Sequence, residues 1–228
     1  MNTEIKELLR GVRDGTVSVE DALLQLKQEP LADLGYAKVD MHRNVRQGAA
    51  EVIYGAGKTQ EQIAGIVRTM MEHGQSRILM TRMNDDKADY LNREFCGGTA
   101  CTPQGLDFTY KKDARIAYFG TPPEPTGIGT ILVATGGTSD LPVAEEAALT
   151  AEFYGNRVLR LYDVGVSGVH RLFSRLDDIM SASVIIAIAG MEGALASVIG
   201  GLADCPVMYP PVWGMGPPFM ACRPCSVC

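Results

Sequence analysis

The second half of the chain alternates short apolar segments with helical patterns, and this alternation strongly limits the folds open to it. Three segments have the length and near-continuous apolar character of buried strands: residues 130–134, 157–162 and 184–189. A helical pattern follows each one, at residues 141–154, 168–180 and 192–202, and residues 205–208 begin a fourth strand. Strands that are buried on both faces and separated by helices are typical of parallel sheets. We therefore expect an α/β fold with a doubly wound parallel sheet.

The first 120 residues follow no single period, and they predict a smaller, mixed α/β domain. Thr59 and Gln62 have the spacing of a capping box. Ser18 is the expected N-cap of the second helix, and Asp21 follows it three residues later. Helices are expected at residues 3–12, 18–27, 59–73 and 88–95, and a strand is expected at residues 75–81.

A segment dense in proline and glycine, GTPPEPTGIG at residues 120–129, separates the two patterns. Such a composition is typical of a linker. The predicted organisation is a first domain at residues 1–120, a linker at 121–129 and a second domain at 130–208.

Charge and hydropathy exclude several classes of protein. The formal net charge is -6, so no overall positive field attracts nucleic acid or anionic lipid. The first fifteen residues, MNTEIKELLRGVRDG, lack the apolar core of a signal peptide. The longest apolar stretch, residues 183–203, is interrupted by Glu192 and several glycines, so a strand, loop and helix explain it better than a membrane span. We expect a cytoplasmic protein without nucleic-acid or membrane partners.

The loop that follows the first strand of the second domain has the composition of an anion site. Ligands of open α/β sheets bind at the carboxyl ends of the strands. Glycines let the backbone approach a ligand, hydroxyls donate, and the free N–H groups of the next helix attract phosphate. The candidate ligand-binding residues are Gly136, Gly137, Thr138, Ser139 and Asp140. The same residues also fit a tight turn in which Asp140 simply caps the helix.

Two further loops lie at the same predicted edge. Ser167, His170 and Arg171 follow the second strand, and a His beside an Arg can bind an anion and move a proton. A surface His in the first helical turn is the alternative. Gly190, Met191 and Glu192 follow the third strand. Glu192 is a candidate base or ribose ligand. Alternatively, its negative charge only interacts favourably with the positive end of the helix dipole.

Two motifs are rejected as metal or nucleotide sites. The segment GAGKT at residues 55–59 ends like a phosphate loop, but the spacing GxxxxGK[ST] requires a glycine at position 52, which is Val52. His42, Arg43, Arg46, Glu51 and Lys58 are the polar residues of that region. The spacing of Cys222, Cys225 and Cys228 suggests an iron–sulfur site only superficially, because the segment around them predicts no fold. No metal site is expected.

The three loops resemble those of the aminoimidazole-ribonucleotide carboxylase/mutase (PurE) family. GTSD at residues 137–140 is similar to that family's G-S-x-S-D loop, and SGVHR at 167–171 is similar to its S-A-H-R loop. AGMEGAL at 189–195 occupies the place of A-G-G-A-A-H-L, with Ala194 where that family has its catalytic His.

A longer resemblance, over residues 1–208, is to the LarB family of pyridinium biscarboxylic acid mononucleotide synthases, which begin nickel-pincer cofactor assembly. It is carried by five segments: DMHRNVRQG, EVIYGAGKT, ATGGTSDLPVAEEA, VGVSGVHRL and AGMEGALASVIGGL. The resemblance implies carboxylation of the pyridinium ring of nicotinic acid adenine dinucleotide at C5, and hydrolysis of its phosphoanhydride to release AMP. Carbon dioxide is then the co-substrate, no tightly bound cofactor is expected, and a need for Mg²⁺ is left open.

The same resemblance implies site roles and assembly. Ser139 and Asp140 would hold ribose or phosphate, His170 and Arg171 an anion, and Glu192 a polar part of the substrate, with His170 and Glu192 as the catalytic groups. A homo-oligomer is implied, an octamer if the PurE-like domain assembles as PurE does. The alternatives are an aminoimidazole-ribonucleotide mutase of purine biosynthesis and a non-catalytic nucleotide-binding protein.

The last twenty residues depart from this resemblance. LarB proteins carry a nucleophilic Cys beyond a V-P-T-S-V-G-Y-G loop, and no Cys of this chain matches it. Residues 209–228 instead read YPPVWGMGPPFMACRPCSVC. Back-translated in a shifted frame from Met208, codons that encode this segment can read VPTSVGYGASFHGLPALLGV, and three glycines and one valine are forced whatever the codon choice. We therefore interpret residues 209–228 as a frameshifted tail.

Overall fold

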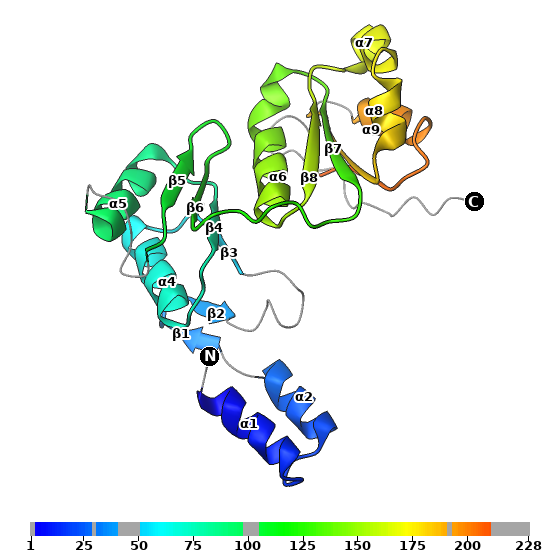
Figure 1. The fold of residues 1–228 in the computed structure, drawn as a ribbon. Coiled ribbons are helices and arrows are strands. Elements are labelled where there is room, and N and C mark those ends of the chain that lie inside the picture. The colour runs from blue at the N-terminus through cyan, green and yellow to red at the C-terminus, as the bar shows by residue number, and fades with distance from the viewer. Residues whose placement is uncertain (1–2, 29–30, 41–50, 98–104, 191–192, 211–228) are drawn as a thin grey trace. The chain divides into compact units, whose positions relative to one another are not determined.

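The computed structural model describes residues 3–28, 31–40, 51–97, 105–190 and 193–210. The chain divides into two compact units, residues 1–110 with 117–121 and residues 111–116 with 122–228 (Figure 1). Residues 121–129, the predicted linker, form neither helix nor strand. The predicted tail lies outside the described residues from position 211 onward.

The first unit begins with two helices at the predicted places, α1 (Thr3–Arg13) and α2 (Val19–Gln28). Ser18 caps α2, because its Oγ accepts a 3.0 Å hydrogen bond from the N–H of Asp21. Two short antiparallel strands follow, β1 (Leu31–Asp33) and β2 (Lys38–Asp40). These strands were not predicted, because three residues are too few to show a period.

A mixed four-stranded sheet forms the centre of the first unit, in the order β3-β4-β6-β5. β3 pairs parallel with β4, and β4 pairs antiparallel with β6. The strand bounds are β3 (Val52–Tyr54), β4 (Ile78–Thr81), β5 (Phe108–Lys111) and β6 (Ile116–Phe119). Of these, only β4 lies in a segment predicted as a strand. It is shorter than predicted, and Gln75, the first residue of the predicted strand, instead donates to the carbonyl of Met70 in the turn that ends the preceding helix.

Two helices pack on that sheet. α4 (Gln60–Glu72) has the predicted capping box, in which Thr59 and Gln62 exchange side-chain-to-backbone hydrogen bonds. α5 (Asp85–Cys96) starts earlier than the predicted residue 88, because Asn84 caps it by accepting a bond from the N–H of Lys87. The buried core joins both helices to the sheet and includes Ile63, Val67, Met70, Met80, Leu91 and Phe119.

The second unit is the predicted doubly wound parallel sheet, with strands in the order β10-β9-β7-β8. The strand bounds are β7 (Thr130–Thr135), β8 (Arg157–Leu161), β9 (Val184–Ile188) and β10 (Val207–Met208). In chain order this is 2-1-3-4, the start of the flavodoxin-like order. The predicted α/β class of PurE-like type is confirmed.

Helices cover both faces of this sheet (Figure 1). α6 (Leu141–Phe153) packs on the face that carries Val133 and Ile188. The opposite face, with Leu132 and Ile185, packs against three helices: α7 (Val169–Phe173), α8 (Leu176–Ser181) and α9 (Ala194–Gly200). Because alternate residues of each strand serve opposite faces, a continuous apolar strand is what this arrangement requires.

Two predicted helices differ from those observed. The helix expected at 168–180 is split into α7 and α8 at Ser174, whose hydroxyl donates to the carbonyl of Arg171 at 2.8 Å. Such a side-chain bond competes with the helical ladder. The helix expected at 192–202 begins at Ala194, because Gly193 precedes it in the left-handed region at φ +70°. No described helix is both long and apolar enough to cross a membrane.

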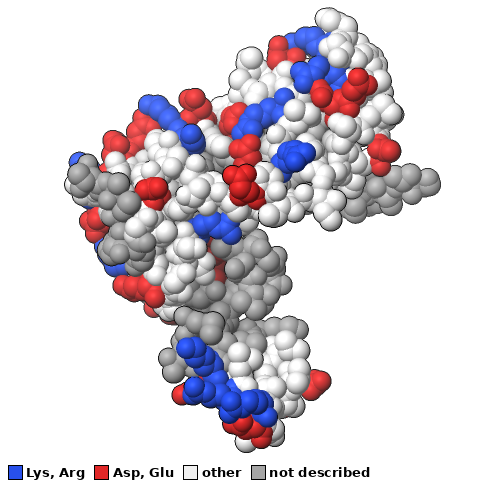
Figure 2. All heavy atoms as spheres, in the orientation of Figure 1, with Lys and Arg blue, Asp and Glu red and all other residues white. Residues whose placement is uncertain are grey.

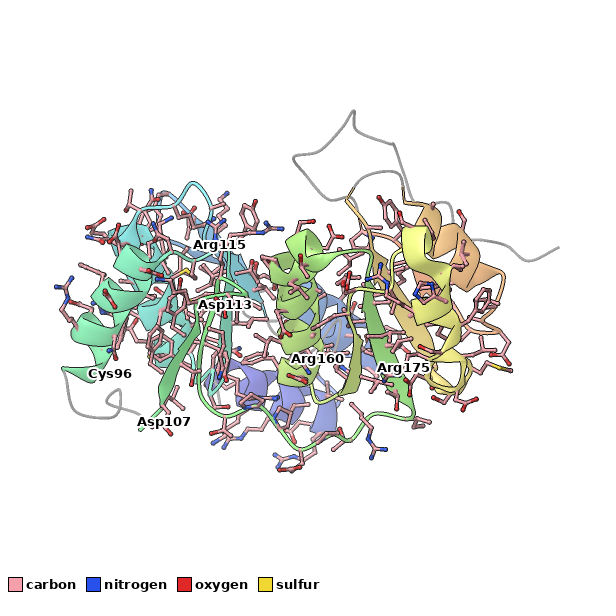
Figure 3. The ribbon with its side chains drawn as sticks, turned by 90° about the horizontal axis from the view of Figure 1, so that it is seen from above. Cys96, Asp107, Asp113, Arg115, Arg160 and Arg175 are labelled. Atoms are coloured by element: carbon pink, nitrogen blue, oxygen red, sulfur yellow. The ribbon has the colours of Figure 1, made fainter. Side chains whose placement is uncertain are left out.

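An ion-pair network braces β8, an edge strand, against α6. Arg160 lies beside α6 (Figure 3) and pairs with Glu145 at 3.2 Å and with Glu152. The hydrogen bond to Glu152 raises the pKa of Arg160, and burial raises the pKa of Tyr162, which donates to Glu145 at 2.8 Å. The face in view carries charges of both signs interspersed (Figure 2).

The capping box gives a test of the first unit. Replacing Thr59 with Ala should lower the free energy of unfolding by about 0.5–2 kcal/mol, because the N–H of Gln62 loses its acceptor. Urea titration followed by circular dichroism measures the change. Glu72→Ala, an exposed substitution at the other end of the same helix, is the control and should change it by no more than about 0.5 kcal/mol. Equal effects of the two substitutions would contradict the capping assignment.

Candidate functional site

The candidate site is the carboxyl edge of the parallel sheet, where the chain leaves β7 and β9 toward opposite faces. β7 continues into α6 on one face and β9 into α9 on the other. In doubly wound sheets this divergence opens a crevice between the two loops. The predicted site residues lie on the loops after β7, β8 and β9.

The loop after β7 is tied to both neighbouring strands. Thr135 is fully buried, and its hydroxyl accepts a 3.0 Å bond from the N–H of Asp163, while its carbonyl accepts one of 2.9 Å from Val164. On the other side, the N–H of Gly136 donates to the carbonyl of Ile188 at 2.9 Å. The end of β7 therefore holds the loops after β8 and β9 in register.

The hydroxyl-bearing part of this loop faces solvent. Thr138 and Ser139 are exposed in a short 3₁₀ turn, Thr138–Asp140, and their hydroxyls bond to no described residue. A Cβ on Gly137 would meet its nearest neighbour, the Ser139 Oγ, only at 4.0 Å. Thr138 and Ser139 thus present two exposed hydroxyls near the start of α6, where the helix dipole favours an anion.

Asp140 is buried, with 7% of its surface exposed. Its Oδ2 accepts a hydrogen bond from the N–H of Gly137 at 3.2 Å, and its Oδ1 accepts one from the N–H of Gly190, also at 3.2 Å. Asp140 occupies the N-cap position of α6, but its carboxylate makes no capping bond to that helix. Asp140 therefore does not cap α6 with its side chain, although its bond to Gly137 does close the tight turn before that helix.

The loop after β8 packs directly on the loop after β7. A Cβ on Gly165 would lie 2.4 Å from the carbonyl oxygen of Gly136, which is backbone and cannot move aside easily. Asp163, two residues earlier, has a left-handed backbone at φ +59°. These two positions explain why the chain can turn so tightly between β8 and α7.

Arg171 and His170 begin α7 beside this turn. Arg171 pairs with Asp163 at 2.5 Å, and the two side chains are 38% and 51% exposed. His170 and Ser167 are exposed, and the His170 ring bonds to no described residue. An exposed ring in the first turn is compatible with either interpretation of His170. The partner of Arg171 was not predicted, because it is eight positions away in the chain, across a turn in which Asp163 has a left-handed backbone.

The loop after β9 is held from two sides. Besides the bond from Gly190 to Asp140, the hydroxyl of Tyr209 donates to the carbonyl of Ala189 at 2.8 Å. The Tyr209 ring also lies against Gly193, where an added Cβ would be 3.0 Å from its Cζ. Met191 and Glu192 lie outside the described residues. Gly190 is thus the one predicted residue of this loop that the structure places, and it faces Asp140.

In the segment at residues 55–59, which was rejected as a phosphate loop, the polar groups bond to other residues of the protein. The hydroxyl of Thr59 caps α4, and the Nζ of Lys58 donates to the carbonyl of Tyr54 at 3.1 Å. The N–H of Gly55 donates to Thr81, and a Cβ there would be 2.8 Å from the same carbonyl. Gly55 therefore serves strand packing. His42, Arg43 and Arg46 lie outside the described residues.

The described residues contain no group of three metal-binding side chains. Two cysteines are described, Cys96, which is buried, and Cys205, which precedes β10. Burial raises the pKa of the Cys205 thiol, and the nearby Asp204 carboxylate raises it further, so its thiolate is disfavoured. Cys101, Cys222, Cys225 and Cys228 lie outside the described residues.

Comparison with known proteins gives two similarities. Residues 31–121 match the family described as the LarB/PurE-like N-terminal domain. An uncharacterized protein of Methanocaldococcus jannaschii is 34% identical over 215 residues, which cover 92% of this chain and 82% of that protein. The second similarity extends well beyond the first, through the parallel sheet and its three loops.

The contact between Gly165 and Gly136 gives a test of the site's construction. Gly165→Ala should destabilise the second unit by about 1–3 kcal/mol, because the new methyl group overlaps the carbonyl of Gly136. Thermal unfolding measures this effect. The matched control is Gly200→Ala in α9, where an added Cβ meets nothing within 4 Å. The control should be neutral or stabilising by up to about 1 kcal/mol. A neutral Gly165→Ala would contradict the close packing of the two loops.

Proposed function

Because the chain belongs to the LarB family, we propose that it carboxylates the pyridinium ring of nicotinic acid adenine dinucleotide and hydrolyses the phosphoanhydride to release AMP. One observation carries the proposal. The loops with the GTSD and SGVHR sequences and the start of the AGMEGAL loop converge at one sheet edge, joined through Thr135, Gly136 and Asp140. Such an edge is where dinucleotides and nucleotides bind in this class of fold.

The loop after β7 is the proposed phosphate and ribose site. The exposed hydroxyls of Thr138 and Ser139 can bond to phosphate oxygens or ribose. The amides of Gly136 and Gly137 already donate within the protein, to Ile188 and Asp140. α6 is 13 residues long, so the positive end of its dipole favours a phosphate there.

The loop after β8 is the proposed site for a second anionic group, either the other phosphate or the nicotinate carboxylate. Arg171 is half-exposed and paired with Asp163. A bound anion can therefore replace the Asp163 carboxylate as the partner of the guanidinium, which is already accessible to solvent. Ser167 and His170 are exposed on the same turn, and His170 is the proposed proton acceptor. Gly190 borders the site, whereas Met191 and Glu192 enter this proposal from the family resemblance alone.

The proposed carboxylation needs a nucleophile, because a pyridinium ring is electron-poor and does not attack carbon dioxide. A thiolate that adds to the ring converts it to a dihydropyridine whose C5 is nucleophilic. C5 then forms a bond to carbon dioxide and loses its proton to a base. The electrons of that C–H bond return to the ring and break the bond between sulfur and the ring carbon to which the thiolate had added, so the thiolate leaves and the pyridinium is restored. The AMP half leaves when water attacks the phosphoanhydride. The described thiols, Cys96 and Cys205, lie outside the three loops.

A non-catalytic nucleotide-binding protein is the second candidate, and the position of the described thiols favours it for the chain as written. An aminoimidazole-ribonucleotide mutase is less well supported, because Ala194, the first residue of α9, stands where that family has its catalytic His. A turnover assay with each nucleotide substrate separates the three.

The proposed frameshift gives the first functional prediction. The chain as written should be inactive, and a version with the frame restored after Met208 and continued through the family's nucleophilic Cys should be active. The assay is incorporation of labelled carbon dioxide into nicotinic acid adenine dinucleotide, together with release of AMP. Equal turnover by both versions would contradict the frameshift and the thiol mechanism. Binding without turnover by both would favour the nucleotide-binding protein.

The proposed role of His170 gives the second functional prediction. In the frame-restored protein, His170→Ala should lower turnover by about 10²–10⁴-fold, the usual effect of losing a general acid or base. The melting temperature should stay the same, because the ring is exposed. Arg175→Ala removes an equally exposed side chain that pairs with Asp178, and it is the control. Wild-type turnover in His170→Ala would contradict its role as proton acceptor and favour the interpretation of His170 as a surface residue.

A further inference from the structure

Asp140 is the sole charged side chain that is buried among the described residues; the other buried polar side chains are Thr69, Thr81 and Thr135. A carboxylate loses favourable hydration when it is buried, and hydrogen bonds from N–H groups compensate for that loss. Asp140 receives one such bond at each oxygen, from Gly137 and from Gly190. Its burial is thus explained by the backbone around it.

The first bond is local, and the second joins segments that are far apart in the chain. Gly137 belongs to the loop after β7, whereas Gly190 is 50 positions away from Asp140 and follows β9. The loops approach closely, since a Cβ on Gly136 would lie 3.2 Å from the Cβ of Ala189 and 3.5 Å from the Oδ2 of Asp140. The carboxylate therefore spans the point at which the sheet sends its connections to opposite faces.

Both side-chain atoms at the end of residue 140 must be hydrogen-bond acceptors, because one receives the N–H of Gly137 and the other the N–H of Gly190. An ionised carboxylate accepts at both oxygens, whereas an amide of the same shape accepts at one position and donates at the other. Asparagine at position 140 would direct an NH₂ group at the N–H of Gly137 or of Gly190. The geometry requires an acceptor oxygen at both positions of the Asp140 side chain.

We propose that Asp140 is a positioning residue, which fixes the loop after β9 against the loop after β7 through the amide of Gly190 and does not itself bind the substrate. Its neighbours Thr138 and Ser139 are exposed and are the residues that reach the ligand. The sequence alone suggested a direct contact between Asp140 and ribose or phosphate, so the two roles make different predictions.

The first arm of the test needs no ligand. In the free protein, Asp140→Asn should speed amide hydrogen exchange of Gly190 at least about tenfold, because its N–H loses a charged acceptor. Exchange within α6 should not change, which establishes that the variant is folded. Ser139→Ala alters the exposed neighbour and keeps the link, so it should leave exchange at Gly190 as in the wild type. Unchanged exchange in Asp140→Asn would overturn the proposal.

The second arm rests on the proposed function and compares two probes, nicotinic acid adenine dinucleotide and inorganic pyrophosphate, by calorimetry. A positioning residue acts on the whole site, so Asp140→Asn should weaken both probes by a similar factor, about 5–150-fold. If Asp140 instead bonds directly to ribose, Asp140→Asn would weaken binding of the dinucleotide and leave that of pyrophosphate unchanged. That result would overturn the proposal. If the wild-type protein binds neither probe, the proposed function fails, while the exchange measurement still decides the role of Asp140.

Discussion

The loops of the second unit depend on the hydrogen bonds that β7 makes on both of its edges. It pairs with β8 from Thr130 to Ala134 and with β9 from Ile131 to Thr135. The pairing continues past the strand, through the hydroxyl of Thr135 to Asp163 and through the amide of Gly136 to Ile188. A slip of one residue at either edge would exchange the strand residues that pack against α6 with those that pack against α7, α8 and α9, and it would also separate the loops.

The parallel sheet was predictable because β7, β8 and β9 each have five or six residues and alternate with helical patterns along the chain. β7 and β9 could be assigned from continuous apolar runs, and β8 from a run that two arginines interrupt. The order in which the strands pair was not predicted. The strands β1, β3, β5 and β6 have three or four residues each. Over such lengths neither period is visible, and pairing with a neighbour decides the structure instead of local preference.

The convergence of the three loops at one sheet edge was predictable, and the contacts between them were less so. Glycines, hydroxyls and a His–Arg pair at strand ends indicated which loops would meet. The sequence did not indicate that Asp140 would be buried and bonded to Gly190, nor that Asp163 would pair with Arg171. Both contacts depend on backbone geometry, a left-handed residue in one case and two loops in close approach in the other, and neither follows from residue type.

The overlap that a side chain at Gly165 would make with Gly136 has a thermodynamic consequence for any ligand of this edge. Two loops in backbone contact have few independent conformations, so their conformational entropy is lost when the unit folds. A ligand then meets loops that are already ordered, and little further entropy is lost when it binds. Stability and affinity are therefore linked at this contact: a change that loosens the two glycines lowers the melting temperature and weakens binding together, even when it touches no ligand atom.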